Sequence, residues 1–164
     1  MIHAATRFRG LPTALIVGAY AAAVLTLTWL TREGFLGDAA YGVMAMVIMA
    51  LPLSLVGTSL YGTLEGAVTG QGPDYAAPGW QYVLMAWPGL VTAVILGLLL
   101  TWRRTRPAAT AAGWALAGLV ILMGAATTFD SWAPRRPYGW PFLIYGSIMV
   151  VALRATRPRP RRRD

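Results

Sequence analysis

Five stretches of uncharged, mainly apolar residues follow one another along the chain, separated by short polar breaks. They cover residues 11–31, 41–64, 81–102, 108–128 and 138–153. A transmembrane helix needs about 20 residues to cross the hydrocarbon core of a bilayer, and the first four stretches reach that length. The pattern therefore predicts an all-α fold, a polytopic transmembrane bundle of about five helices without a soluble domain.

For two of the five stretches, the sequence does not decide whether the helix crosses the membrane. Residues 138–153 reach only about 24 Å at roughly 1.5 Å per residue. They either span with Arg154 extended toward the headgroups or form a re-entrant or tilted interfacial piece. Residues 41–64 contain Pro52, which we expect to bend the helix without breaking it, because neighbouring helices can satisfy the freed carbonyl. A re-entrant course for residues 41–64 would leave four spanning helices.

The composition agrees with a membrane environment. The chain is 57% hydrophobic and 12% charged, and its mean hydropathy is +0.55. A soluble domain of 164 residues needs more charge to cover its surface. All fourteen basic residues are arginines, a bias typical of a GC-rich genome.

Several catalytic classes cannot be built from this inventory. The chain has no cysteine and no lysine, which excludes thiolate metal sites and a Walker A loop. The single histidine, His3, excludes bis-histidine haem, HExxH zinc and Ser-His-Asp sites within one chain. We therefore expect no metal and no cofactor, and we favour a protein that is not an enzyme.

The distribution of the arginines along the chain predicts the orientation of the protein in the membrane. They stand in a basic N-terminal tail at residues 1–10, in the breaks between apolar stretches, and in an Arg/Pro-rich tail at residues 154–164. Five crossings with the N-terminus outside put ten of them on the cytoplasmic side, and a re-entrant second segment puts eleven there, with both termini inside. We prefer five crossings because residues 41–64 are long enough to span. Both arrangements place the C-terminus on the cytoplasmic side of a bacterial inner membrane.

The C-terminal tail predicts contact with anionic lipid headgroups. Each arginine near an anionic leaflet can contribute about 1 kcal/mol to membrane binding. The isoelectric point near 10.8 would also suit nucleic acid, but the arginines flank apolar stretches, which argues against that partner. The headgroup-contacting residues are expected to be Arg154, Arg157, Arg159, Arg161, Arg162 and Arg163.

Small residues recur every fourth position in two of the stretches, a spacing that lets helix backbones approach closely in lipid. The two sets predict helix packing, either within the chain or in a homodimer or larger membrane complex. They consist of Ser54, Thr58, Gly62, Gly66 and Gly70 in the second stretch, and Gly89, Ala93 and Gly97 in the third.

Acidic residues are the remaining candidates for chemistry. Glu65 stands at the end of the second stretch and is the candidate carboxylate for transport, although we favour the simpler explanation of a solvated carboxylate at the helix end. Asp38 and Asp130 also stand at segment edges, and Asp130 is expected to pair with Arg135 or Arg136.

Two motifs stand out in residues 41–106, Ala50-Leu-Pro-Leu-Ser54 and Pro88-Gly-Leu-Val-Thr-Ala-Val-Ile-Leu-Gly97, and an arginine cluster follows the second. With these features, residues 41–106 resemble small multi-span membrane proteins of high-GC actinobacteria, a group whose roles are uncharacterised. It implies a hydrophobic helical fold and assigns no functional residue.

Three functional hypotheses follow from the sequence. The first is a non-enzymatic helical bundle that serves as an auxiliary or interaction subunit in the cytoplasmic membrane. The second is a small transporter or channel subunit that uses Glu65. The third is a membrane enzyme that acts on lipid through acids at the interface.

Overall fold

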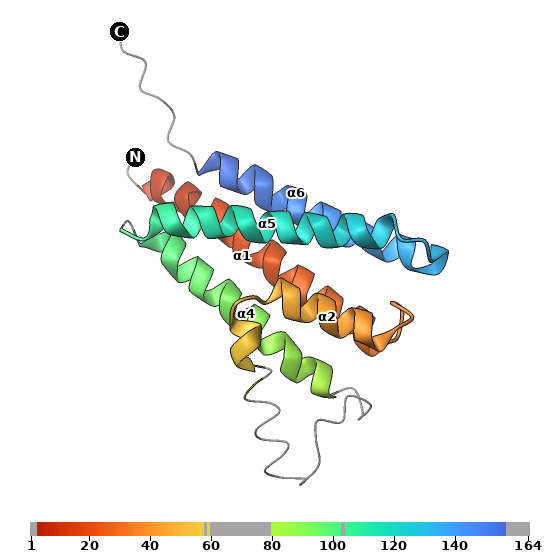
Figure 1. Cartoon of the computed structure of the whole chain (residues 1–164). Helices are drawn as coiled ribbons and strands as arrows, with labels where there is room; N and C mark the ends of the chain where they lie inside the picture. The colour runs from red at the N-terminus through yellow and green to blue at the C-terminus, as the bar shows by residue number, and fades with distance from the viewer. Residues whose placement is uncertain (1–2, 58, 60–79, 103, 157–164) are drawn as a thin grey trace.

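A computed structural model of the chain describes residues 3–57, 59, 80–102 and 104–156, and all regular secondary structure in these ranges is helical. Figure 1 shows the elements packed into a bundle. They are α1 (His3–Arg32), α2 (Ala39–Met49), α4 (Trp80–Thr101), α5 (Arg106–Thr128), the 3₁₀ helix η1 (Ala133–Gly139) and α6 (Trp140–Ala155).

Three helical segments in the described ranges are long and apolar enough to cross a membrane. They are Gly10–Arg32, Arg106–Thr128 and Ala133–Ala155, each of 23 residues. In the last of these, η1 continues directly into α6, so the stretch 138–153, which looked short in the sequence, extends back to Ala133 and forward to Ala155. The part of the chain that the structure describes is therefore a helical bundle with three membrane-capable helices.

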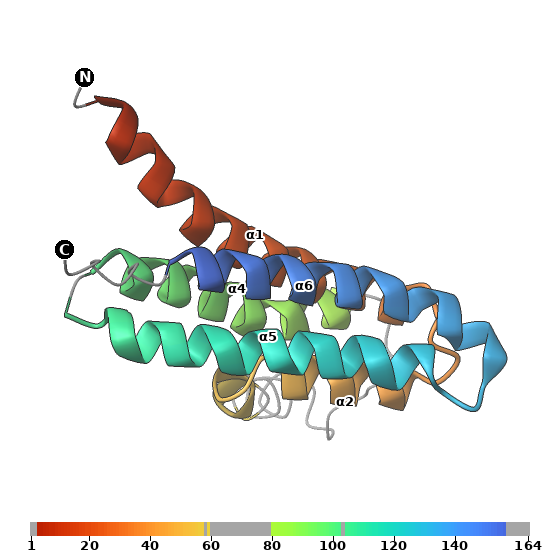
Figure 2. The ribbon, with the colours of Figure 1, turned by 90° about the horizontal axis from the view of Figure 1, so that it is seen from above.

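The helices form an antiparallel bundle around α1. The α5–α6 hairpin packs on one side of α1, and α4 runs antiparallel to it, with Gly97 beside Val17 and Gly89 beside Val24. The start of α1, the end of α4, the start of α5 and the end of α6 all lie at one end, on the left in Figures 1 and 2. We call this the arginine-rich end, after Arg104, Arg106 and Arg154, and the opposite end, with residues 33–38 and 129–139, the loop end.

Helix α2 differs from the sequence prediction of one bent helix over residues 41–64. It ends at Met49, residues 50–52 form a turn, and residues 53–57 are helical again. Pro52 has no N–H to continue the helical ladder, and the chain instead makes turn hydrogen bonds such as Leu51 N to Ile48 O. Residues 58 and 60–64 lie outside the described part of the chain.

Helix α2 returns along only half of α1. At its start Gly42 lies against Thr31, and at its end the Met49 carbonyl meets Tyr20. Helix α4 then runs back to the arginine-rich end. The start of α1 and the end of α6 both lie at that end of the bundle. Five crossings would put these two ends on opposite sides of a membrane, and whether residues 41–64 span or re-enter stays a prediction.

The bundle has an apolar interior and an apolar exterior. Large side chains such as Tyr20, Phe142 and Met149 are fully buried in the core. Outward-facing Leu122 and Val151 are nevertheless more than 60% exposed. Helices that are apolar all round are typical of a protein surrounded by hydrocarbon.

Candidate functional site

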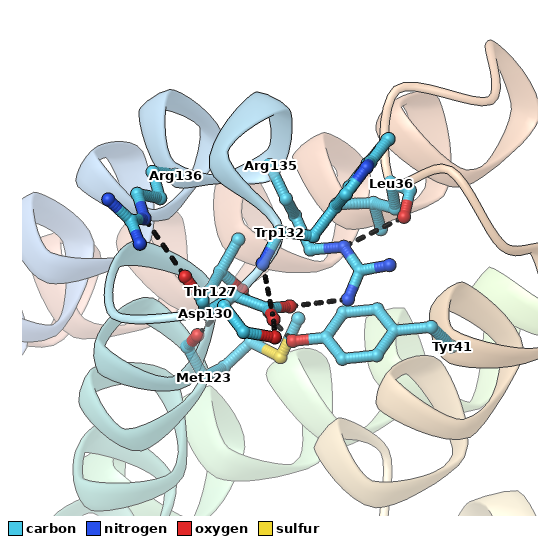
Figure 3. Close-up of polar contacts among 9 residues, drawn as sticks. Leu36, Tyr41, Met123, Thr127, Asp130, Trp132, Arg135 and Arg136 are labelled. Atoms are coloured by element: carbon cyan, nitrogen blue, oxygen red, sulfur yellow. Dashed lines mark hydrogen bonds and ion pairs between the residues drawn. The ribbon is translucent and has the colours of Figure 1, made fainter.

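A polar cluster at the loop end joins α2, α5, η1 and the connection before α2 (Figure 3). Its centre is the Arg135 guanidinium, whose Nε donates to the Leu36 carbonyl at 2.8 Å and whose Nη1 forms an ion pair with Asp130. The same group lies over the Tyr41 ring, 4.0 Å from its centroid. One arginine therefore connects the loop after α5 to the region of Leu36 and Tyr41, more than ninety residues earlier in the sequence.

Asp130 is held as an anion. Its carboxylate accepts hydrogen bonds from the Trp132 backbone N–H at 3.2 Å and the Ser131 hydroxyl at 3.3 Å, besides the Arg135 pair. These donors, chiefly the Trp132 N–H and then Arg135, lower the pKa of Asp130 below its ordinary value of 3.8. The predicted pairing of Asp130 with a neighbouring arginine is confirmed for Arg135.

Two further contacts extend the polar cluster. The Tyr41 and Thr127 hydroxyls lie 3.3 Å apart, and Thr127 donates to the Met123 carbonyl of α5. Arg136 donates from Nε to the Asp130 carbonyl at 2.9 Å. Arg135 and the Tyr41–Thr127 contact fix the start of α2 against α5 and η1, whereas the contact of Arg136 stays within the loop around Asp130. The arrangement can hold the start of α2 in place, and its acid and both guanidiniums are engaged in these contacts.

The opposite end of α2 lies inside the bundle and needs hydrogen-bond donors. The last carbonyls of a helix have no partner within it, and in an apolar interior water does not replace them. The buried Tyr20 hydroxyl of α1 donates to Met49 O at 2.6 Å, and Ser54 donates to Val47 O at 2.7 Å. These two hydroxyls allow α2 to end at half the depth of the bundle.

Sequence reasoning missed the role of Tyr20. The only signal is that Tyr20 stands in the middle of an apolar stretch, away from the interfacial position that tyrosines favour. Its partner depends on where α2 ends, which the sequence does not determine.

An apolar cavity of about 220 Å³ lies between α2 and α5, beginning at Tyr41. Its size is between that of a cavity that takes a small hydrocarbon and that of a drug-sized pocket. Such a space suits hydrocarbon and offers no convergent polar groups. The lining residues are Tyr41, Met44, Ala45, Ile48, Met49, Leu119, Leu122, Met123 and Ala126.

The predicted small-residue positions in α4 face α1. A Cβ on Gly89 would approach the Val24 methyls to 2.9 Å, one on Gly97 would approach Val17 to 3.1 Å, and Ala93 is buried. Ser54 is buried but belongs to the helical residues 53–57 that follow the turn, so it does not continue a helical ladder from α2. Of the other positions in that set, Thr58, Gly62, Gly66 and Gly70 lie outside the described residues.

The remaining candidates are placed separately. Asp38 caps the start of α2 by accepting from Ala40 N at 2.8 Å, and Arg154 is exposed in the last turn of α6. Glu65 and the tail arginines from Arg157 to Arg163 lie outside the described residues. Within the described ranges, His, Asp and Glu form no group of three that could hold a metal ion.

Comparison with models of protein families, with curated proteins and with solved structures finds no match to this chain.

Proposed function

We propose that this chain is a non-enzymatic subunit of the bacterial cytoplasmic membrane that acts by packing with other membrane proteins. In this proposal α1, α4, α5 and α6 cross the bilayer, and α2 enters from the loop end and stops half-way. The observation that carries it is the use of the charged groups at the loop end: Asp130, Arg135 and Arg136 are engaged in tying segments together. A site of this kind builds a stable scaffold.

The arginines support an orientation with both ends in the cytoplasm. Eleven of the fourteen belong to segments that adjoin the arginine-rich end in the sequence, and only Arg32, Arg135 and Arg136 adjoin the loop end. The positive-inside rule assigns the richer side to the cytoplasm. This orientation replaces the outside N-terminus preferred from the sequence.

The outer faces of the helices support association within the membrane. The half-length α2 leaves an apolar cavity open against α5, and exposed Met44 and Leu122 line it. In lipid, helices associate through close packing rather than through the hydrophobic effect, so a shaped apolar surface suits a protein partner.

Purification in mild detergent tests the proposal. We expect a stable oligomer or a co-purifying membrane protein, and we expect Ala45→Phe, which fills the cavity between α2 and α5, to weaken that association. Ala115→Phe on the exposed face of α5 is the matched control. A wild-type monomer that brings down no partner would contradict the proposal.

A second function is favoured by the interruption of the helix at residues 50–52. Short, proline-interrupted segments at half depth are typical of substrate sites in transporters. In this alternative Glu65, which follows the interruption in the sequence, exchanges a proton for a cation. Glu65→Gln should then abolish proton-coupled flux in vesicles, whereas Asp38→Asn should not; unchanged flux in the Glu65 variant would exclude Glu65 as the coupling group.

A further inference from the structure

A second cavity, of about 570 Å³, opens at the arginine-rich end between α1, α4 and the start of α5. This volume lies within the range of about 300–1,000 Å³ typical of ligand pockets. Figure 2 shows why space exists there: the first turns of α1 diverge from α4 and α6. The cavity belongs to a different face and the opposite end of the bundle from the polar cluster.

The walls of this cavity have two chemical characters. Small residues and short aliphatic side chains of α1 and α4 form an apolar slot, lined by Gly10, Ala14, Val17, Gly97 and Leu100. Thr13, Thr101 and Arg106 supply the polar part. Arg106 is the first residue of α5 and is exposed, and it comes two residues after the exposed Arg104.

We propose that this cavity binds one anionic phospholipid. The Arg106 guanidinium would receive the phosphate, for which its planar fork is well suited, and the apolar slot would hold the upper part of an acyl chain. The charge at this end favours an anionic lipid over a zwitterionic one, since Arg104, Arg106 and Arg154 add to the same local field.

The inference rests on the proposed membrane location, but it does not depend on a protein partner. Failure to find a partner would leave the lipid site standing. Failure to find the lipid site would leave the membrane location standing.

Native mass spectrometry of the detergent-purified full chain, titrated with phosphatidylglycerol or with phosphatidylcholine of the same acyl chains, tests the site. We expect one phosphatidylglycerol to bind at least about tenfold more tightly than further phosphatidylglycerol molecules and than phosphatidylcholine. Both lipids carry a phosphate, but the arginines at this end repel the choline ammonium of phosphatidylcholine. Added inorganic phosphate should not displace it, since the acyl chain contributes to binding.

Three variants locate the site. Arg106→Gln should abolish the preferred phosphatidylglycerol, and Ala14→Phe should do the same by filling the slot while every charge is kept. Arg104→Gln is the matched control: it removes one charge from the same end without altering the cavity lining, so the preferred lipid should remain.

Four outcomes would overturn the proposal. They are equal loss in the Arg104 and Arg106 variants, tight binding that survives Ala14→Phe, equal affinity for the two lipids, and displacement by inorganic phosphate. Occupation of the cavity by a second copy would appear as a dimer that Ala14→Phe dissociates, and it would also contradict the lipid site.

Discussion

Single hydroxyl groups decide where α2 can end. The Met49 carbonyl is buried, and Tyr20 supplies its donor from α1. Removal of that donor leaves a buried carbonyl unpaired, at a cost of about 1 kcal/mol within a membrane bundle. The position of one tyrosine thus stabilises a helix end that lipid alone would not tolerate.

Tyr20→Phe should therefore lower the stability of the bundle by about 1 kcal/mol. Thermal unfolding in detergent measures the change. Tyr138→Phe, which keeps the ring that stacks on Phe35, is the control and should unfold close to the wild-type temperature. A Tyr20 variant as stable as the wild type would show that the hydrogen bond to Met49 O does not stabilise the end of α2.

The ion pair of the polar cluster predicts a dependence on pH. The pKa of Asp130 is lowered in the folded protein, so its contribution to stability is present above the ordinary value of 3.8 and is lost as the pH falls through the lower folded value. We expect the unfolding temperature to decline on acidification below that ordinary value. Asp130→Asn should be less stable near neutral pH and should show a shallower decline; an unchanged acid profile would contradict the role of Asp130.

At the scale of the helices, the apolar pattern predicts most of the fold. The predicted stretches 81–102 and 108–128 differ from α4 and α5 by at most two residues at either end, because uncharged runs of this length have few alternatives to helix. The 3₁₀ turn before α6 could not be predicted, since Arg135 and Arg136 interrupt the apolar run there.

The course of α2 required tertiary contacts that the sequence does not reveal. Pro52 signalled an irregularity, but the choice between a bend and a turn depends on donors from elsewhere, here Tyr20 and Ser54. Of the contacts in the polar cluster, the sequence predicted only the local ion pair between Asp130 and a nearby arginine. The contacts of Arg135 with Leu36 and Tyr41 span more than ninety residues and follow from the fold.

Close approach of α5 and α6 provides a test at the scale of the helices. A Cβ on Gly124 would lie 2.8 Å from the backbone nitrogen of Leu143, which cannot move without moving α6. Gly124→Ala should therefore destabilise the hairpin by about 1–3 kcal/mol, measured by thermal unfolding in detergent. Gly118→Ala on the same helix meets nothing within 4 Å and should be neutral or slightly stabilising. Equal effects of the two substitutions would contradict the helix packing described.

At the scale of the whole molecule, the arrangement of helix ends connects the fold to its surroundings. The described helices bring Arg104, Arg106 and Arg154 to one end and the acid-containing loops, with Asp38 and Asp130, to the other. This separation of charge along the bundle axis is the basis of the proposed orientation and of the proposed lipid site. An apolar exterior between the two ends supplies the surface that lipid and membrane partners would contact.

Single-cysteine accessibility mapping in membranes tests the central claim most directly, and the chain contains no cysteine of its own. The reporters are Thr6→Cys and Ala108→Cys near the arginine-rich end, and Glu33→Cys and Ser131→Cys at the loop end. With the arginine-rich end in the cytoplasm, we expect an impermeant reagent added from outside to label the Glu33 and Ser131 reporters. The Thr6 and Ala108 reporters should be labelled only after the membrane is opened. Labelling of Thr6 and Ala108 from opposite sides, or of Glu33 and Ser131 from opposite sides, would contradict a half-depth α2 and restore the five-crossing arrangement.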